Sequence, residues 1–264
     1  MDLQLEGKRA LVTGSTAGIG YAIAEALMKE GAVTIVNGRT SPRVEQALAK
    51  LNGQGFPGRA EGFAANLGTA EGVDGIINRF PDADILVNNL GIFEVKPFEE
   101  IPDADWIRFF EVNVLSGVRL SRHYLPRMKQ RGWGRIVFIS SESAIQIPVE
   151  MIHYGMTKTA QLAVSRGLSE TTAGTDITVN SILAGPTASE GATEFMARAA
   201  AQQKIDLATF EREFFRSMRP TSLLKRFAKP AEVAALVAFV CSPLSSGTNG
   251  AALRVDGGVV RSII

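Results

Sequence analysis

Residues 9–20, Arg-Ala-Leu-Val-Thr-Gly-Ser-Thr-Ala-Gly-Ile-Gly, decide the fold of this chain. A short apolar run suited to a buried strand leads into three glycines, Gly14, Gly18 and Gly20, and then into a helical pattern. Glycines let a backbone turn sharply and approach a pyrophosphate, whose charge the first amides of the following helix attract. The spacing differs from the G-x-G-x-x-G dinucleotide motif, so a plain strand-to-helix turn is the alternative. Its place after the first strand of an alternating chain favours a nucleotide site.

Beyond this turn, short runs rich in Val and Ile alternate with longer segments of helical periodicity. This alternation predicts a parallel sheet. The expected strands are residues 9–13, 33–37, 62–65, 85–88, 135–140, 178–183 and 253–255. One expected helix runs from the glycine turn to Gly31, and the others cover residues 42–51, 69–80, 103–131, 153–172 and 230–241. We therefore predict an α/β fold of Rossmann type: one domain, residues 1–264, with a doubly wound parallel seven-stranded sheet and helices on both faces.

The composition disfavours several other classes of protein. Lys and Arg number 28 and Asp and Glu 27, and this formal charge of +1 argues against a nucleic-acid partner. A single cysteine, Cys241, and two histidines, His123 and His153, offer no spacing for a zinc site, so no metal is expected. No apolar run approaches the roughly 18 residues of a membrane span, so no membrane partner is expected. We predict a cytoplasmic protein.

The end of the second expected strand indicates which nucleotide is bound. Dinucleotide folds usually carry Asp or Glu there to hold the ribose hydroxyls, but this chain reads Asn37-Gly38-Arg39-Thr40. A carboxylate would repel a 2′-phosphate, whereas a guanidinium binds it through paired hydrogen bonds. Arg39 therefore favours NADP(H) over NAD(H), the alternative being a solvated loop arginine.

Two ionisable side chains stand one helical turn apart at the start of the expected helix 153–172. Tyr154 and Lys158 are spaced i and i+4, so the ammonium can approach the phenol. A positive charge can lower the pKa of a tyrosine from about 10 and make it an acid–base catalyst. An exposed pair is the alternative. The preceding strand ends in Ser140-Ser141, which places two hydroxyl groups at the carboxyl edge of the sheet, where ligands bind. The alternative is that these serines only cap the end of the strand.

Together these residues resemble the short-chain dehydrogenase/reductase family, including its 3-oxoacyl reductase-like members, over nearly the whole chain. Residues 13–20 are similar to the family's Thr-Gly-x₃-Gly-x-Gly, and residues 88–91, Asn-Asn-Leu-Gly, to its Asn-Asn-Ala-Gly. Asn113, Ser141, Tyr154 and Lys158 match its Asn-Ser-Tyr-Lys tetrad in order and spacing. The resemblance implies the family's fold and a nicotinamide cofactor.

The resemblance also implies residue roles. Tyr154 is expected to be the general acid in reduction and the base in oxidation, with its pKa lowered by Lys158, which also holds the nicotinamide ribose. Ser141 is expected to hydrogen-bond the substrate oxygen, and Asn113 to order a proton-relay water. The cofactor is expected to contact Gly14, Ser15, Thr16, Gly18, Ile19, Gly20, Arg39, Asn66, Leu67, Asn89, Gly91, Tyr154, Lys158, Gly185 and Thr187.

Two residues near the expected cofactor, Asn66 and Ala17, depart from common family patterns. Asn66 stands where an aspartate commonly meets the adenine, and its acceptor oxygen can keep that contact. Ala17 stands where some NADP-preferring members carry a second basic residue, so the NADP(H) prediction rests on Arg39.

The expected activity is hydride transfer between NADP(H) and a carbonyl or secondary alcohol, chiefly NADPH-dependent reduction of a hydrophobic ketone or 3-oxoacyl substrate. A mostly apolar mouth supports this substrate class, with Phe93, Ile145, Ile147, Met151 and Ile152. The alternatives are a hydroxysteroid or sugar-alcohol dehydrogenase and, from another class, a non-catalytic nucleotide-sensing Rossmann protein. The resemblance further implies a homo-oligomer, a tetramer or a dimer, joined through helices 103–131 and 153–172.

Residues 188–222 interrupt the alternation, because ordinary connections span only about 2–6 residues. Apolar residues recur there at three- and four-residue spacing, which predicts one or two amphipathic helices: Phe195, Met196, Ile205, Leu207, Phe210, Phe214, Phe215 and Met218. We interpret the segment as a lid over the substrate. Extra core or a subunit contact is the alternative.

Overall fold

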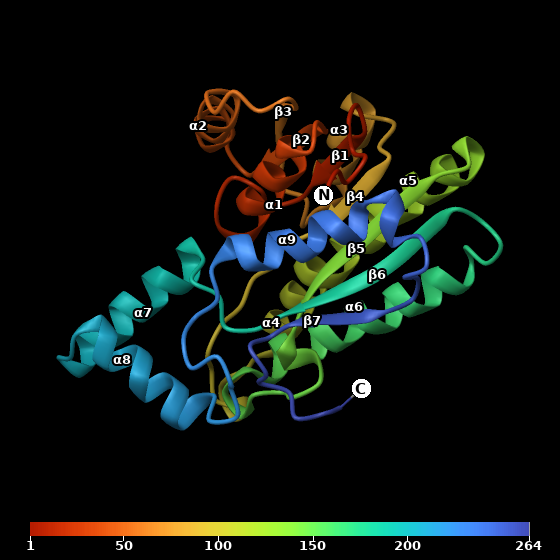
Figure 1. The fold of residues 1–264 in the computed structure, drawn as a ribbon. Helices are drawn as coiled ribbons and strands as arrows, with labels where there is room; N and C mark the ends of the chain where they lie inside the picture. Colours follow the sequence, from red (N-terminus) through yellow and green to blue (C-terminus); the bar gives the residue numbers. More distant parts are fainter. Residues whose placement is uncertain (264) are drawn as a thin grey trace.

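A computed structural model, which describes residues 1–263, contains a seven-stranded sheet in the order β3-β2-β1-β4-β5-β6-β7 (Figure 1). All neighbouring strands are parallel. The strands are β1 (Arg9–Val12), β2 (Val33–Gly38), β3 (Arg59–Ala64), β4 (Ile85–Asn88), β5 (Gly134–Ser141), β6 (Ile177–Ala184) and β7 (Ala252–Val255). The chain winds outward from β1 to β3, returns to β4 and continues to β7. The carboxyl ends of β1 and β4 therefore meet where the winding reverses, and the predicted single-domain, doubly wound fold is confirmed.

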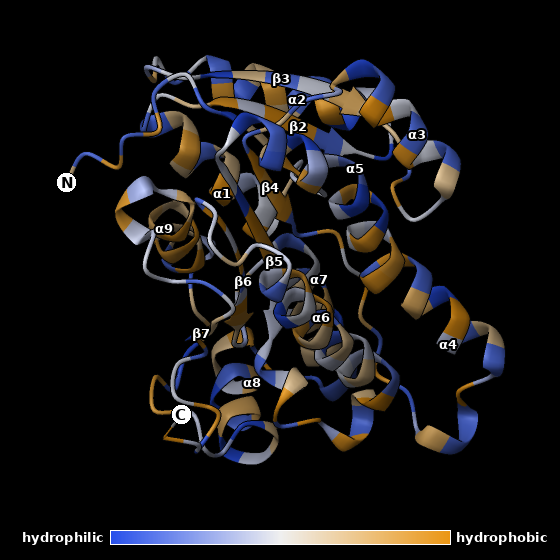
Figure 2. Ribbon diagram, turned by 90° about the vertical axis from the view of Figure 1, so that its right-hand side faces the viewer, coloured by the Kyte–Doolittle hydropathy of each residue, from blue (hydrophilic) through white to orange (hydrophobic). Residues whose placement is uncertain are grey.

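Helices cover both faces of the sheet. They are α1 (Gly18–Lys29), α2 (Ser41–Asn52), α3 (Ala70–Arg79), α4 (Asp103–Phe110), α5 (Ser116–Arg131), α6 (Ile152–Glu170), α7 (Glu190–Gln203), α8 (Leu207–Glu213) and α9 (Pro230–Cys241). Strand side chains alternate between the faces, so Val12 and Val87 pack toward α1 and α9, whereas Leu11 and Leu86 pack toward α3 and α5. Figure 2 shows apolar strands at the centre and polar residues on the outer helix surfaces.

Two predicted boundaries were wrong. Strand β3 begins at Arg59 instead of residue 62, because it is the edge strand of the sheet and carries the polar residues Arg59 and Glu61. The helix expected over residues 103–131 is divided into α4 and α5 by a π-helical turn, η2 (Glu111–Leu115). Periodicity does not show this turn, because the residues on either side of it remain helical.

The segment 188–222 contains α7, α8 and a second π-helical turn, η5 (Phe214–Met218). Figure 1 shows α7 and α8 together beyond the end of β6, away from the N-terminal half of the sheet. Among residues 1–263, no helix is both long and apolar enough to cross a membrane. The same described residues contain no group of three or more His, Cys, Asp or Glu side chains that could hold a metal ion.

Candidate active site

A cavity of about 380 Å³ lies at the carboxyl ends of β1, β4, β5 and β6, and this volume is typical of a ligand pocket. Its wall also includes the start of α6 and parts of α7 and η5. The predicted site residues that line it are Gly18, Ile19, Gly20, Asn89, Gly91, Ser141, Tyr154, Lys158, Gly185 and Thr187. One cavity thus joins the glycine-rich turn to three members of the tetrad.

The glycine-rich turn has the geometry that a pyrophosphate requires. Gly14 and Gly18 have φ angles of +60° and +58°, which favour glycine. A Cβ atom on Gly20 would lie 2.5 Å from Asn89 Nδ2, so no side chain fits there. Ala17 begins α1 without a side-chain cap, which leaves the first amides of the helix for an anion. The residues present therefore fit a dinucleotide.

Asn89 fastens this turn to the neighbouring strand. Its Nδ2 donates to the carbonyls of Thr13 and Gly14, at 2.9 and 3.0 Å. Thr13 Oγ1 accepts in return from the amides of Asn89 and Leu90, both at 2.9 Å. These bonds hold the ends of β1 and β4 together at the reversal of the winding.

The side chains of Ser15 and Leu67 are buried in the fold. Ser15 is fully buried, and its Oγ donates to Val12 O at 2.6 Å and accepts from the Asn37 amide at 2.9 Å. Leu67 is 1% exposed and packs in the core. The other predicted residues outside the cavity lining are Gly14, Thr16, Arg39, Asn66 and Asn113.

The end of β2 has no room for an acidic side chain at Gly38. A Cβ atom on Gly38 would lie 2.5 Å from Thr16 Cγ2. Arg39 follows, exposed and without a hydrogen-bond or ion-pair partner among residues 1–263. Sequence reasoning missed Arg43, four residues further on, which forms an ion pair with Glu190 of α7 and connects α2 with the segment 188–222. Its i+4 spacing from Arg39 was the available signal.

Asn66, expected beside the adenine, lies on the exposed surface. Its Oδ1 accepts from the Gly68 amide at 3.2 Å. The acceptor that was expected to serve the adenine is therefore engaged in a local turn.

Lys158 is buried among acceptors. Its Nζ donates to Ile139 O at 2.9 Å and to Gln161 Oε1 at 3.3 Å, and lies 5.6 Å from the centre of the Tyr154 ring. Burial lowers the pKa of Lys158 to about 8. Burial also raises the pKa of Tyr154, and the negative charge of Glu142 adds to the rise. The pKa of Tyr154 therefore lies above its ordinary value in this structure, because burial has the largest effect.

Asn113 lies in the π-helical turn η2, outside the cavity lining, and is 1% exposed. Its Oδ1 accepts from the Ile92 amide at 2.8 Å, and its Nδ2 donates to Ile92 O and to Thr157 Oγ1, both at 3.0 Å. Its backbone carbonyl accepts from Gln161 Nε2 at 2.6 Å. The side chain thus fixes the loop after β4, and Gln161, which sequence reasoning missed, connects Asn113 to Lys158.

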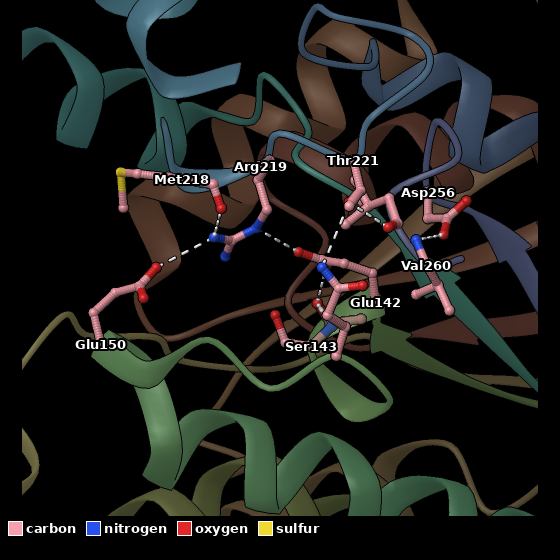
Figure 3. A network of polar contacts seen from close by, with 12 residues as sticks. Glu142, Ser143, Glu150, Met218, Arg219, Thr221, Asp256 and Val260 are labelled. Carbon is pink, nitrogen blue, oxygen red and sulfur yellow. Dashed lines mark hydrogen bonds and ion pairs between the residues drawn. The ribbon is translucent and has the colours of Figure 1, made fainter. Parts of the chain in front are cut away.

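Ser141 ends β5, and the next residue, Glu142, belongs to a chain of charged groups that also contains Arg219 and Glu150 (Figure 3). Its Oγ donates to Glu142 Oε2 and accepts from the Ser143 amide at 3.1 Å. Arg219, directly after η5, binds Glu142 through Nε at 3.1 Å and Glu150 through Nη1 at 3.2 Å. Sequence reasoning missed Arg219, which lies far from Ser141 in the chain, and Glu150, which lies in the segment that leads to α6.

The apolar part of the cavity comes partly from the segment 188–222. This segment contributes four large apolar residues to the lining, Phe195, Met196, Phe214 and Met218. Of the residues expected at the mouth, Phe93 and Met151 line the cavity, whereas Ile145 and Ile147 are about half exposed outside it. Ile152 is also outside the lining.

Known proteins resemble this chain over its whole length. A family model described as short chain dehydrogenase matches residues 8–200. An uncharacterized oxidoreductase, YvaG, of Bacillus subtilis (strain 168) is 48% identical over 263 residues, with 100% of both chains covered. A 3-oxoacyl-(acyl-carrier-protein) reductase of Aquifex aeolicus (strain VF5) is 32% identical, covering 98% of this chain and 100% of that one. L-sorbose reductase from Gluconobacter frateurii, solved with NADPH and L-sorbose, superposes with a TM-score of 0.93 at 32% identity, with 100% of both chains covered.

Replacing Gly20 with alanine tests the turn. The added Cβ would collide with Asn89 Nδ2 and Gly14 O, so we expect NADPH affinity to fall about tenfold or more, which corresponds to roughly 1.4 kcal/mol of lost contacts. Fluorescence titration measures this loss. Gly167→Ala is the matched control, because nothing lies within 4 Å of a Cβ in that part of α6; it should bind NADPH normally and be more stable by up to about 1 kcal/mol. Equal affinities in both variants would contradict the assignment.

Proposed function

Since the chain belongs to the short-chain dehydrogenase/reductase family, we propose that it is an enzyme that reduces a ketone with NADPH and oxidises the secondary alcohol in reverse. The observation that carries this proposal is the single cavity that joins the glycine-rich turn to Ser141, Tyr154 and Lys158. A protein that only sensed nucleotide would not need these side chains at the far end of the cavity from the turn. Their presence favours catalysis over the sensing alternative.

In this mechanism a hydride reaches the carbonyl carbon and a proton reaches its oxygen. The bound cofactor supplies the hydride. Tyr154 donates the proton to the carbonyl oxygen, and its raised pKa keeps the phenol protonated at neutral pH, as reduction requires. Ser141 hydrogen-bonds the same oxygen. Two of the three Lys158 N–H groups are engaged, which leaves one for the cofactor's ribose.

The preference for NADP(H) is proposed from Arg39 and Gly38. Arg39, exposed and without a partner among residues 1–263, is available to a 2′-phosphate, and the crowding at Gly38 disfavours the carboxylate that would hold the hydroxyls of NAD(H). The remaining cofactor contacts expected from the sequence, including Asn66 and Leu67, are part of the same proposal.

The apolar lining supports the first substrate candidate, a hydrophobic ketone or 3-oxoacyl compound. A second candidate is the interconversion of a sugar and its alcohol. Two observations favour it: the likeness to L-sorbose reductase and the charged groups of Glu142, Glu150 and Arg219 in the cavity wall. The segment 188–222 would cover either substrate as a lid.

We also propose a homo-oligomer, a tetramer or a dimer, in the cytoplasm. Exposed Ile107 and Phe110 on α4 support the proposed assembly through residues 103–131 and 153–172, and sedimentation measures the oligomeric state. The single cysteine, Cys241, is buried, which suits a reducing compartment.

Tyr154→Phe tests the chemistry. The variant keeps the ring but loses the proton donor, so we expect kcat with NADPH and a ketone panel to fall by about 10²- to 10⁴-fold. NADPH affinity, measured by titration, should change by less than about threefold, which corresponds to about 0.6 kcal/mol of binding free energy. Turnover equal to that of the wild type would remove Tyr154 from the mechanism.

Arg39→Ala tests cofactor choice. A charge-assisted hydrogen-bond pair is worth about 1.5–3 kcal/mol, so the ratio of kcat/KM with NADPH to that with NADH should fall about 10- to 100-fold. Arg59→Ala is the control, since Arg59 begins β3 at the other end of the strand from the cavity. An unchanged ratio in Arg39→Ala would show that another group binds the phosphate.

A further inference from the structure

Three charged side chains lie in the otherwise apolar substrate end of the cavity. Arg219 is 7% exposed, Glu142 is 4% exposed, and both line the cavity with Glu150. Figure 3 shows Arg219 between the two carboxylates. Burying charges costs free energy unless partners satisfy them, so the donors and acceptors that remain open indicate what this part of the cavity binds.

Some hydrogen-bonding capacity in this group is unused. Arg219 donates through Nε to Glu142 and through Nη1 to Glu150 and Met218 O, while Nη2 has no partner among residues 1–263. Glu150 uses only one carboxylate oxygen within the same described residues. An apolar substrate would desolvate these atoms without replacing their hydrogen bonds. A hydroxyl group, which both donates and accepts, would satisfy them.

The charged group lies beside the reacting oxygen. Glu142 accepts the hydroxyl proton of Ser141, the residue proposed to bind the carbonyl oxygen. The charges of both Glu142 and Arg219 also act on the Tyr154 hydroxyl. Because the charged group adjoins Ser141, a hydroxyl on the carbon next to the carbonyl is the substrate group that we assign to it.

The net charge of the group disfavours one class of substrate, the carboxylates. Two carboxylates and one guanidinium give a formal −1, so a substrate carboxylate at this place would be repelled. The apolar residues Phe195, Phe214 and Phe227 also line the cavity and can contact the carbon chain of a substrate.

From these contacts we propose that Glu142, Glu150 and Arg219 form a subsite for a hydroxyl next to the carbonyl, so that the enzyme selects neutral α-hydroxy ketones over plain ketones and 2-oxo acids. This inference rests on the proposed reductase function. Sites built to bind a substrate hydroxyl reject analogues that lack it, because their own polar groups are then left unpaired.

Three six-carbon ketones that differ only at C1 test the subsite: hexan-2-one, 1-hydroxyhexan-2-one and 2-oxohexanoate. With NADPH, kcat/KM for the hydroxy ketone should exceed that for hexan-2-one by about 100-fold, and the oxo acid should do no better than hexan-2-one. In Arg219→Met the preference for the hydroxy ketone should fall to about tenfold or less. Glu150→Gln removes one negative charge and should raise kcat/KM for the oxo acid about tenfold.

Arg216→Met is the control, because Arg216 lies in the same π-helical turn, exposed and paired with Glu213. It should keep the wild-type preferences. Urea unfolding verifies that the variants are folded. If Arg219→Met does not fold, the subsite is tested with Glu150→Gln alone. A wild type that reduced hexan-2-one as well as the hydroxy ketone would overturn the subsite but not the reductase function. No turnover of any ketone would overturn both.

A second inference rests on a separate observation, the buried side chain of Gln161 in α6. This side chain is 1% exposed and spans the space between the Asn113 carbonyl and the Lys158 ammonium. Its amide orientation is determined by chemistry, because the carbonyl can only accept and the ammonium can only donate. The resemblance implies that Asn113 orders a proton-relay water; in this structure the Asn113 carbonyl accepts from Gln161, which also accepts from Lys158.

The geometry points to Gln161 as a positioning residue that holds the Lys158 ammonium against Ile139 O and ties it to the π-helical turn η2. Because Ile139 O and Gln161 Oε1 fix two of the ammonium N–H groups, the direction of the third N–H is fixed as well. An amide side chain does not pass protons as water does, so Gln161 orients Lys158 and does not relay a proton to the surface.

The pKa of Lys158 in the cofactor-free protein tests this role. In ¹⁵N NMR titration, with the signal assigned by its loss in Lys158→Arg, the wild type should titrate near 8. Gln161→Leu removes an acceptor and should lower this pKa, and Gln161→Glu adds a negative charge and should raise it. Gln161→Leu should also raise KM for NADPH about tenfold, since roughly one hydrogen-bonded contact is misplaced.

Gln130→Leu, at an exposed position near the end of α5, is the matched control and should leave both values unchanged. A purely structural Gln161 would lower stability in both variants without opposite shifts in the pKa of Lys158. Such a result, or an unshifted titration in folded variants, would overturn the assignment.

Discussion

The buried ammonium of Lys158 is the constraint on which the candidate active site depends. The residue is 5% exposed, and a charge removed from water in this way costs several kcal/mol unless hydrogen bonds replace its hydration. The replacements come from Ile139 at the end of β5 and Gln161 one turn further along α6. Gln161 in turn donates to the carbonyl of Asn113, which lies in η2. The π-helical turn and the hydrogen bonds of the Lys158 ammonium therefore belong to one network.

The same network lies beside a glycine after β4. A Cβ atom on Gly91 would lie 3.4 Å from Lys158 Nζ and 3.5 Å from Asn113 Oδ1, so this loop is in van der Waals reach of both groups. Asn89, two residues earlier, fastens the glycine-rich turn to β4. The loop after β4 therefore joins the expected pyrophosphate site to the residues that hold Lys158, and a shift in this loop would disturb both.

The substrate end of the cavity combines two opposite environments. The segment 188–222 contributes aromatic and methionine side chains, but Arg219, which directly follows its last helical turn, forms buried ion pairs with Glu142 and Glu150. These ion pairs join the end of the segment to the residue that follows Ser141. Arg219 therefore belongs both to the segment proposed as the lid and to the polar part of the cavity wall.

The sequence by itself determined the α/β class and the strands around the sheet, and it predicted the tetrad, because periodicity, glycine turns and motif spacing are local properties of the chain. It also predicted a lid from residues 188–222, and Phe195 and Phe214 of this segment line the cavity. It did not indicate that η2 interrupts the helix 103–131, since the turn is stabilised by contacts of Asn113 with Ile92 and Thr157. Only the tertiary structure joined Gln161 to Asn113 and Arg219 to Glu142, because these partners are 48 and 77 residues apart and meet only when β5, α6 and η5 pack together.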